Sequence, residues 1–194
     1  MKKHMLTTKR IVMIALLAAL TTAGSYARIT IPLDIAGTTS FHLGNIMCAL
    51  SGILLGPWFG GLAAGLGSAI FDMLNPLYIS ECWITFLTKG TYAIVTGLVA
   101  WGFRGHWQAQ NSKSLLRAYL ATAAGAITYA AIYLAKSFFY NGLLLSGLAP
   151  EAAGLNLISK LPATAFNAAI AIICAPVLAF TISKTLTLNH LTTE

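Results

Sequence analysis

Three stretches of the chain place polar and aromatic side chains at helical spacing inside long apolar segments. Residues three or four apart lie on one face of a helix. The three faces consist of Thr85, Lys89, Tyr92 and Thr96; of Tyr129, Tyr133, Lys136 and Tyr140; and of Lys160, Thr164 and Asn167. Aromatic walls can stack on a small, flat organic molecule, and a few fixed polar groups can select it by hydrogen bonding. The three faces therefore predict a pocket for such a ligand.

Lys89 gives the most direct argument for a cavity. It lies six residues inside the apolar segment 83–103, which is about 9 Å along a helix axis. An ionisable side chain at membrane depth costs about 2.5–3.5 kcal/mol on insertion scales, so it usually faces a cavity or a partner. The alternative is that Lys136 and Lys160 extend to lipid headgroups while the aromatic residues form an interfacial belt.

We predict ten substrate-binding side chains, six from the helix faces and four from segments near their outer ends. They are Lys89, Tyr92, Tyr133, Lys136, Lys160 and Asn167, with His42, Asn45, Glu81 and Trp83. No catalytic residue, metal site or cofactor is predicted, because the four histidines lie far apart and no H-E-x-x-H motif occurs. The chain also has no glycine-rich phosphate-binding motif. Uphill transport would therefore draw its energy from an ion gradient or from a partner.

The elements that position these side chains are predicted to be membrane helices. The chain has 194 residues, of which 57% are hydrophobic and 9% charged, and its mean hydropathy is +0.76. A soluble domain carries about 25% charged residues. This deficit excludes a soluble enzyme, a disordered chain and a soluble nucleic-acid-binding fold, although the net charge is +7. We expect a multi-pass protein of the cell membrane.

We predict an all-α bundle that forms a single domain over residues 1–194. The uncharged run 35–71 is too long for one crossing, and Gly56-Pro57 divides it into two short helices. The N-terminal segment also resembles a cleavable signal peptide, but its 17 uncharged residues from Ile11 to Ala27 are long enough to span the membrane. The six predicted transmembrane helices cover about 11–27, 41–55, 58–74, 83–103, 115–140 and 161–183.

Basic residues indicate the orientation of this bundle. Under the positive-inside rule, segments rich in lysine and arginine are cytoplasmic. The basic residues gather before the first helix, between the fourth and fifth, and after the sixth: Lys2, Lys3, Lys9, Arg10, Arg104, Lys113, Arg117 and Lys184. Both termini are therefore predicted to be cytoplasmic. The main connections on the outer side are 28–40, which contains Asp34, 75–82, and 141–159.

Small residues recur every four positions in three of the predicted helices. In lipid, helices associate through close backbone approach at such residues. The three ridges are Ala15-Ala19-Ala23, Gly61-Gly65-Ala69 and Ala171-Ala175-Ala179. Each ridge either packs inside the bundle or faces another membrane subunit.

Several of these segments together resemble one known family. They are Ala15-x-x-x-Ala19, Phe41-His42-Leu43-Gly44-Asn45, the run from Leu54 to Ala69 with Asp72 after it, and Phe86-Leu87-Thr88-Lys89-Gly90. Over nearly its whole length the chain resembles the substrate-binding S components of energy-coupling factor (ECF) vitamin transporters. The similarity is greatest to their riboflavin-like or hydroxymethylpyrimidine/pyridoxine-like branch.

The resemblance implies a protein that captures a vitamin or precursor from outside the cell. It implies partners as well: one transmembrane coupling subunit and two cytoplasmic ATPase subunits. In the family, the ligand lies in the outer half of the membrane among helices four to six, beneath the loop after the first helix. The coupling contact lies on the A-x-x-x-A motif, which places it here on the ridge of Ala15, Ala19 and Ala23.

The identity of the ligand stays open at this point. The three lysines favour a carboxylate such as pantothenate, whereas Glu81, Asn167 and the tyrosines favour a neutral or weakly basic heterocycle. We favour a pyridoxine- or hydroxymethylpyrimidine-like heterocycle, with riboflavin, pantothenate and a queuosine precursor as alternatives. A membrane-embedded enzyme and a self-sufficient secondary transporter are the alternatives of another class. Against them, acids are scarce in the predicted spans, and no internal repeat is seen.

Overall fold

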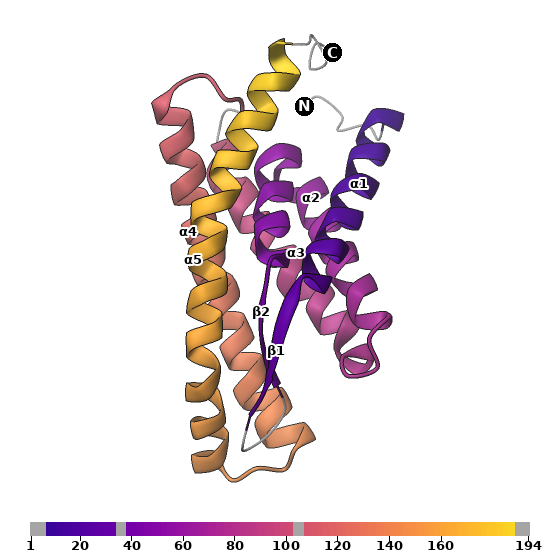
Figure 1. The fold of residues 1–194 in the computed structure, drawn as a ribbon, viewed down its shortest axis with the longest axis vertical. Coiled ribbons are helices and arrows are strands. Elements are labelled where there is room, and N and C mark those ends of the chain that lie inside the picture. The colour runs from indigo at the N-terminus through magenta and orange to yellow at the C-terminus, as the bar shows by residue number, and fades with distance from the viewer. Residues whose placement is uncertain (1–6, 34–37, 103–106, 189–194) are drawn as a thin grey trace.

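The computed structural model describes residues 7–33, 38–102 and 107–188, and in these ranges the chain consists of helices, one β-hairpin and short connections (Figure 1). The long helices are α1 (Thr8–Tyr26), α2 (Gly44–Met73), α3 (Cys82–Trp101), α4 (Ser112–Lys136) and α5 (Pro150–Leu188). A 3-10 turn, η1 (Ile79–Glu81), precedes α3, and a π-helical segment, η3 (Ser137–Leu145), follows α4. The predicted all-α class is confirmed.

Five helical stretches among the described residues are long and apolar enough to cross a membrane. Their outer faces are apolar too, because large hydrophobic side chains such as Leu98, Ile127 and Ile173 are exposed. A helix satisfies its backbone hydrogen bonds internally, which lipid requires. The expectation of a membrane protein is therefore confirmed.

The helix α2 is a hairpin of two antiparallel halves, divided at the predicted Gly56-Pro57 position. Gly56 has φ 79° and ψ −177°, which is not helical. The Sγ atom of Cys48 lies 3.8 Å from the Oγ atom of Ser68, although 20 residues of straight helix would separate them by about 30 Å. The two halves of α2 therefore pack side by side.

Gly56→Ala should destabilise the protein. Side chains rarely adopt this backbone conformation, and a Cβ atom at Gly56 would lie 2.7 Å from the indole ring of Trp101. Strained backbone of this kind costs about 1–3 kcal/mol, so we expect a lower melting temperature in detergent. Gly154→Ala is the control, because a Cβ atom there has no neighbour within 4 Å. A Gly56→Ala protein that melts as late as the wild type would contradict this account of the turn.

The connection between α1 and α2 is a β-hairpin rather than an irregular loop. β1 (Arg28–Pro32) pairs antiparallel with β2 (Thr38–His42), and Arg28 lies opposite His42. Residues 29–31 are extended in β1, whereas Phe41 and His42 end β2 and do not begin a helix as predicted. The β-branched residues of both strands explain the difference. The predicted loop charge Asp34 lies outside the described residues.

The last helix begins much earlier than predicted. α5 starts at Pro150 instead of 161, so much of the predicted loop 141–159 is helical. Pro150 occupies the first turn, where proline is favoured, and Pro162 lies inside the helix, as membrane helices tolerate.

At the start of α4, the Asn111 side chain accepts a hydrogen bond from the backbone N–H of Ser114 at 3.1 Å. This cap begins α4 at Ser112 rather than at the predicted 115.

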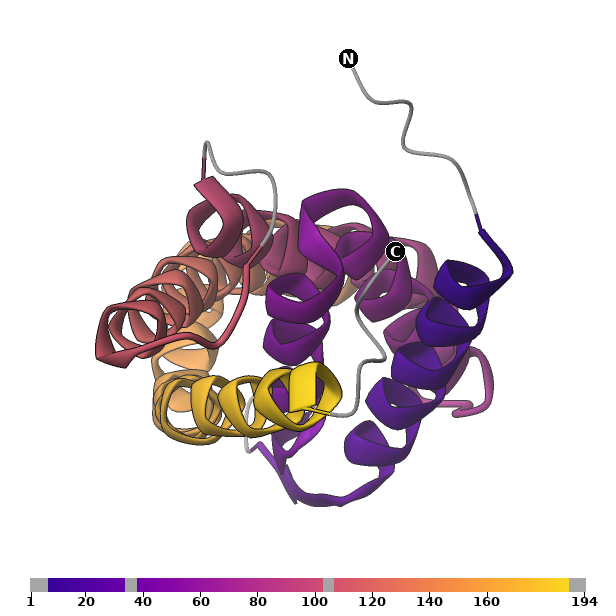
Figure 2. The same ribbon diagram turned by 90° about the horizontal axis from the view of Figure 1, so that it is seen from above.

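α1 and α4 begin, and α5 ends, at the same end of the bundle (Figure 1). The described basic residues of these segments therefore gather there: Lys9, Arg10, Lys113, Arg117 and Lys184. Lys2, Lys3 and Arg104 lie outside the described residues. Seen along the bundle, α1 and α4 lie on opposite sides of α2 (Figure 2).

The three small-residue ridges have different environments. Ala171, Ala175 and Ala179 are fully buried. On the second ridge, a Cβ atom at Gly61 would lie 2.5 Å from Cγ1 of Ile94 in α3, so this ridge packs inside the bundle as well. The ridge on α1 is different, because Ala15, Ala19 and Ala23 are all exposed.

Candidate ligand-binding site

A cavity of about 270 Å³ lies between the β-hairpin, the second half of α2 and helices α3, α4 and α5. Seven of the ten predicted substrate-binding residues line it, although they come from five different elements. They are His42, Glu81, Lys89, Tyr133, Lys136, Lys160 and Asn167. The three predicted helix faces thus converge on one hollow.

Asn45, Tyr92 and Trp83 do not line the cavity, which corrects the prediction of direct contact. Asn45 is 2% exposed and accepts a hydrogen bond from the Lys89 ammonium. Tyr92 is fully buried and stacks on Tyr129, with ring centroids 5.6 Å apart. These two residues support lining residues from behind. Trp83 is 56% exposed and lies outside the cavity, because it is on the outer face of the first turn of α3.

The aromatic wall of the cavity is built from α4. Tyr129 and Tyr133 are one turn apart, and their rings are stacked with centroids 5.8 Å apart. The Nζ atom of Lys89 lies 4.1 Å from the ring centroid of Tyr129. A cation over an aromatic face is attracted to it. The wall therefore combines a surface for ring stacking with a positive charge.

Arg28 brings a second positive charge to the cavity from the start of β1. Its guanidinium carbon lies 4.1 Å from the ring centroid of Phe71 and 5.1 Å from that of Tyr78. Its Nε atom donates a hydrogen bond to the backbone oxygen of Ser25 at 2.8 Å. These contacts fix the guanidinium beside the cavity.

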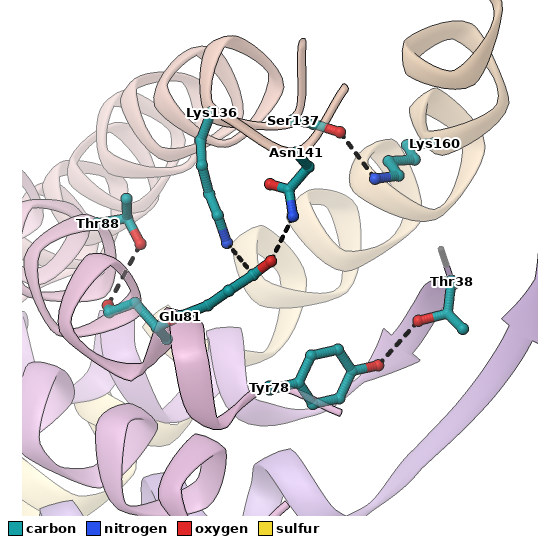
Figure 3. A network of polar contacts seen from close by, with 9 residues as sticks. Thr38, Tyr78, Glu81, Thr88, Lys136, Ser137, Asn141 and Lys160 are labelled. Carbon is teal, nitrogen blue, oxygen red and sulfur yellow. Dashed lines mark hydrogen bonds and ion pairs between the residues drawn. The ribbon is translucent and has the colours of Figure 1, made fainter. Parts of the chain in front are cut away.

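Figure 3 shows a polar network that joins η1, α4, η3 and α5. The Glu81 carboxylate pairs with the Lys136 ammonium and accepts a hydrogen bond from the Asn141 amide. Beside it, the Lys160 ammonium donates to the Ser137 hydroxyl at 2.8 Å. Among the cavity-lining residues of η1, α4, η3 and α5, Glu81 has the only carboxylate, and the network already binds it.

Asn167 fastens the β-hairpin to α5. Its side-chain oxygen accepts a hydrogen bond from the backbone N–H of His42 at 2.9 Å, and its side-chain nitrogen donates to the Ser40 carbonyl at 2.7 Å. Thr38 at the start of β2 shares a hydrogen bond of 3.0 Å with Tyr78, which lies between α2 and η1 (Figure 3). Strand β2 therefore covers one side of the cavity.

His42 lies at the end of β2 with an uncharged imidazole at neutral pH. Burial is the main cause that lowers its pKa well below 6.5, and the positive charges of Lys89 and Arg28 add to this effect. The Nδ1 atom of His42 is buried and has no hydrogen-bond partner among the described residues. The described part of the protein therefore leaves this buried nitrogen without a partner.

Several lining residues were not predicted from the sequence. Asn156 lies one helical turn before Lys160 and extends the same face. Continuing the four-residue spacing backwards from Lys160 would have found it. Arg28 sits in what looked like a connecting loop, and nothing in its spacing indicates a site. Within the described residues, no group of His, Cys, Asp and Glu side chains could hold a metal ion.

Comparisons with known proteins agree with this picture. A family model described as the ECF-type riboflavin transporter, S component, matches residues 5–184. The chain is also similar to a protein of Pyrococcus woesei that is described as an uncharacterized protein in the gap 3' region. The two are 30% identical over 124 residues, which are 64% of this chain and 74% of that protein.

Proposed function

We infer the function from one premise: this chain belongs to the ECF-type riboflavin transporter S component family. It is accordingly a multi-pass protein of the cell membrane and a non-enzymatic subunit of a vitamin transporter. We propose further that it crosses the membrane six times, with each half of α2 counted as one crossing. Both termini then lie in the cytoplasm, as the basic residues at that end of the bundle favour.

The cavity is proposed to bind a B-type vitamin or precursor from outside the cell. The observation that carries this proposal is the stacked pair Tyr129 and Tyr133 beside the Lys89 ammonium, inside a cavity of about 270 Å³. This volume is just below the range for ligand pockets, about 300–1,000 Å³. It favours a small heterocycle of the pyridoxine or hydroxymethylpyrimidine type. Riboflavin is the second candidate, because the description of the family names it.

The family further supports assembly with an ECF transmembrane coupling subunit and two ATPase subunits. We propose that the exposed ridge of Ala15, Ala19 and Ala23 on α1 contacts the coupling subunit. Small residues allow two membrane helices to approach closely and to slide on one another. ATP hydrolysis by the partners would then reorient the loaded bundle and release the ligand inside.

Mass spectrometry of small molecules released from the purified, denatured protein tests the proposed cavity. We expect a stoichiometric vitamin or precursor from the wild type and none from Ala163→Phe, because Ala163 is buried and lines the cavity. Ala165→Phe is the matched control, since Ala165 is exposed on the same helix. Equal amounts of ligand from both variants would place the ligand elsewhere. Uptake that needs no ATPase partner would instead favour a self-sufficient secondary transporter.

A further inference from the structure

We propose that the ligand carries an anionic group and that the Lys160 ammonium binds it. This inference rests on the proposed function, because it concerns the ligand of the same cavity.

Positive charge exceeds negative charge around the cavity. The lining side chains include four cations and two carboxylates: Arg28, Lys89, Lys136 and Lys160, with Asp72 and Glu81. Among the described residues, the pair of Lys136 and Glu81 is the one ion pair found. Buried charges are normally paired, because an unpaired charge loses its hydration without compensation. The lining of the cavity therefore carries more positive than negative charge, and a ligand anion would balance it.

Of these cations, Lys160 has the weakest direct contacts. It is 6% exposed, and its ammonium donates one hydrogen bond, to the Ser137 hydroxyl at 2.8 Å. An ammonium has three N–H donors. Lys89, by comparison, has both the Asn45 oxygen and the Tyr129 ring. A ligand anion is the partner that would satisfy the remaining donors of Lys160.

Asn156 gives independent evidence that a ligand group belongs beside Lys160. It lies one turn earlier on α5, is 2% exposed and lines the same cavity. Its side-chain oxygen is buried and has no hydrogen-bond partner among the described residues. A buried polar atom without a partner is costly. This oxygen is an acceptor, so it can take a hydrogen bond from an N–H or O–H group of the ligand that lies next to its anionic substituent.

Two of the groups that favoured a neutral ligand, Glu81 and Asn167, are already engaged by the protein. The Glu81 carboxylate is held by Lys136 and Asn141. Both ends of the Asn167 amide bind the backbone of β2. Beside the Asp72 carboxylate, the cavity therefore offers cations, aromatic rings, the Asn156 amide and the His42 imidazole. This combination matches a small ring or chain with a carboxylate or phosphate substituent.

Calorimetry with matched pairs of ligands tests the inference. Each pair has a neutral and an anionic member: pyridoxine and 4-pyridoxate, pantothenol and pantothenate, riboflavin and riboflavin 5′-phosphate. In the pair that fits the cavity, we expect the anionic member to bind the wild type about ten-fold tighter or more, because a charge-assisted hydrogen bond is gained. Lys160→Gln should remove this preference, so that the variant binds the two members with similar affinity.

Two further variants guard against a folding artefact. Lys160→Arg keeps the charge and should keep the preference for the anion. Lys113→Gln removes an exposed lysine at the start of α4, at the other end of the bundle from the cavity, and should have no effect.

Tighter binding of the neutral member would overturn the inference and leave the proposed function standing. Equal loss of both members in Lys160→Gln would assign Lys160 a structural role and also overturn it. If no member binds and no molecule is released from the purified protein, the proposed function itself fails, and the inference fails with it.

Discussion

Replacing Ala15 and Ala19 together with leucine should leave ligand affinity unchanged and reduce uptake to background. Both alanines are exposed on α1, while α1 supplies the cavity only from its C-terminal end, at Ser25. Leucine side chains on this ridge would hold the coupling helix of a partner apart from α1 and remove the close backbone approach that membrane helices require. The measurement compares binding to the purified protein with uptake by proteoliposomes that contain the coupling subunit and both ATPases.

Ala165→Leu with Ala169→Leu is the control for this double variant. These alanines are also exposed and four residues apart, but they lie on α5. We expect normal binding and normal uptake from the control. Normal uptake by the α1 variant would exclude the ridge as the coupling contact, whereas loss of binding would show that α1 shapes the cavity.

The environments of the three ridges show why spacing alone could not select this contact. All three have small residues at intervals of four, so the sequence treats them alike. Only the fold shows that Ala171 and Ala175 are buried and that Gly61 faces Ile94, whereas Ala15 is exposed. A small-residue ridge can contact a partner only where no other helix of the chain covers it. Which ridge is left uncovered depends on how the helices are arranged.

Helical periodicity predicted the part of the cavity lining that the helices contribute. Lys89, Tyr133 and Lys160 are polar or aromatic interruptions of apolar helices, and their faces converge as expected. The roles of Arg28 and β2 were not predictable in this way, because a hairpin that covers a cavity is positioned by distant contacts such as the hydrogen bonds of Asn167. Asn156 was missed because the start of α5 was placed too late.

Lys89→Met should lower ligand affinity by about ten- to a hundred-fold, which corresponds to the loss of about 1.5–3 kcal/mol for a hydrogen bond to a charged group. The ammonium of Lys89 lines the cavity beside Tyr129, and methionine has a similar length without the charge. The protein should remain folded, because the substitution removes a buried charge that has no carboxylate partner among the described residues. Titration calorimetry and the melting temperature of the same sample measure the two effects separately.

Lys89→Met also affects Asn45, and a second variant separates this effect from the loss of the charge. Without Lys89, the side-chain oxygen of Asn45 loses its hydrogen bond inside the bundle, and an unsatisfied buried group costs about 1–3 kcal/mol. Adding Asn45→Leu to Lys89→Met removes this group and should restore the melting temperature but not the ligand affinity. If the double variant regains affinity together with stability, Lys89 supports the fold and does not contact the ligand. If affinity stays low in a protein as stable as the wild type, the ammonium itself binds the ligand, because stability then no longer explains the loss.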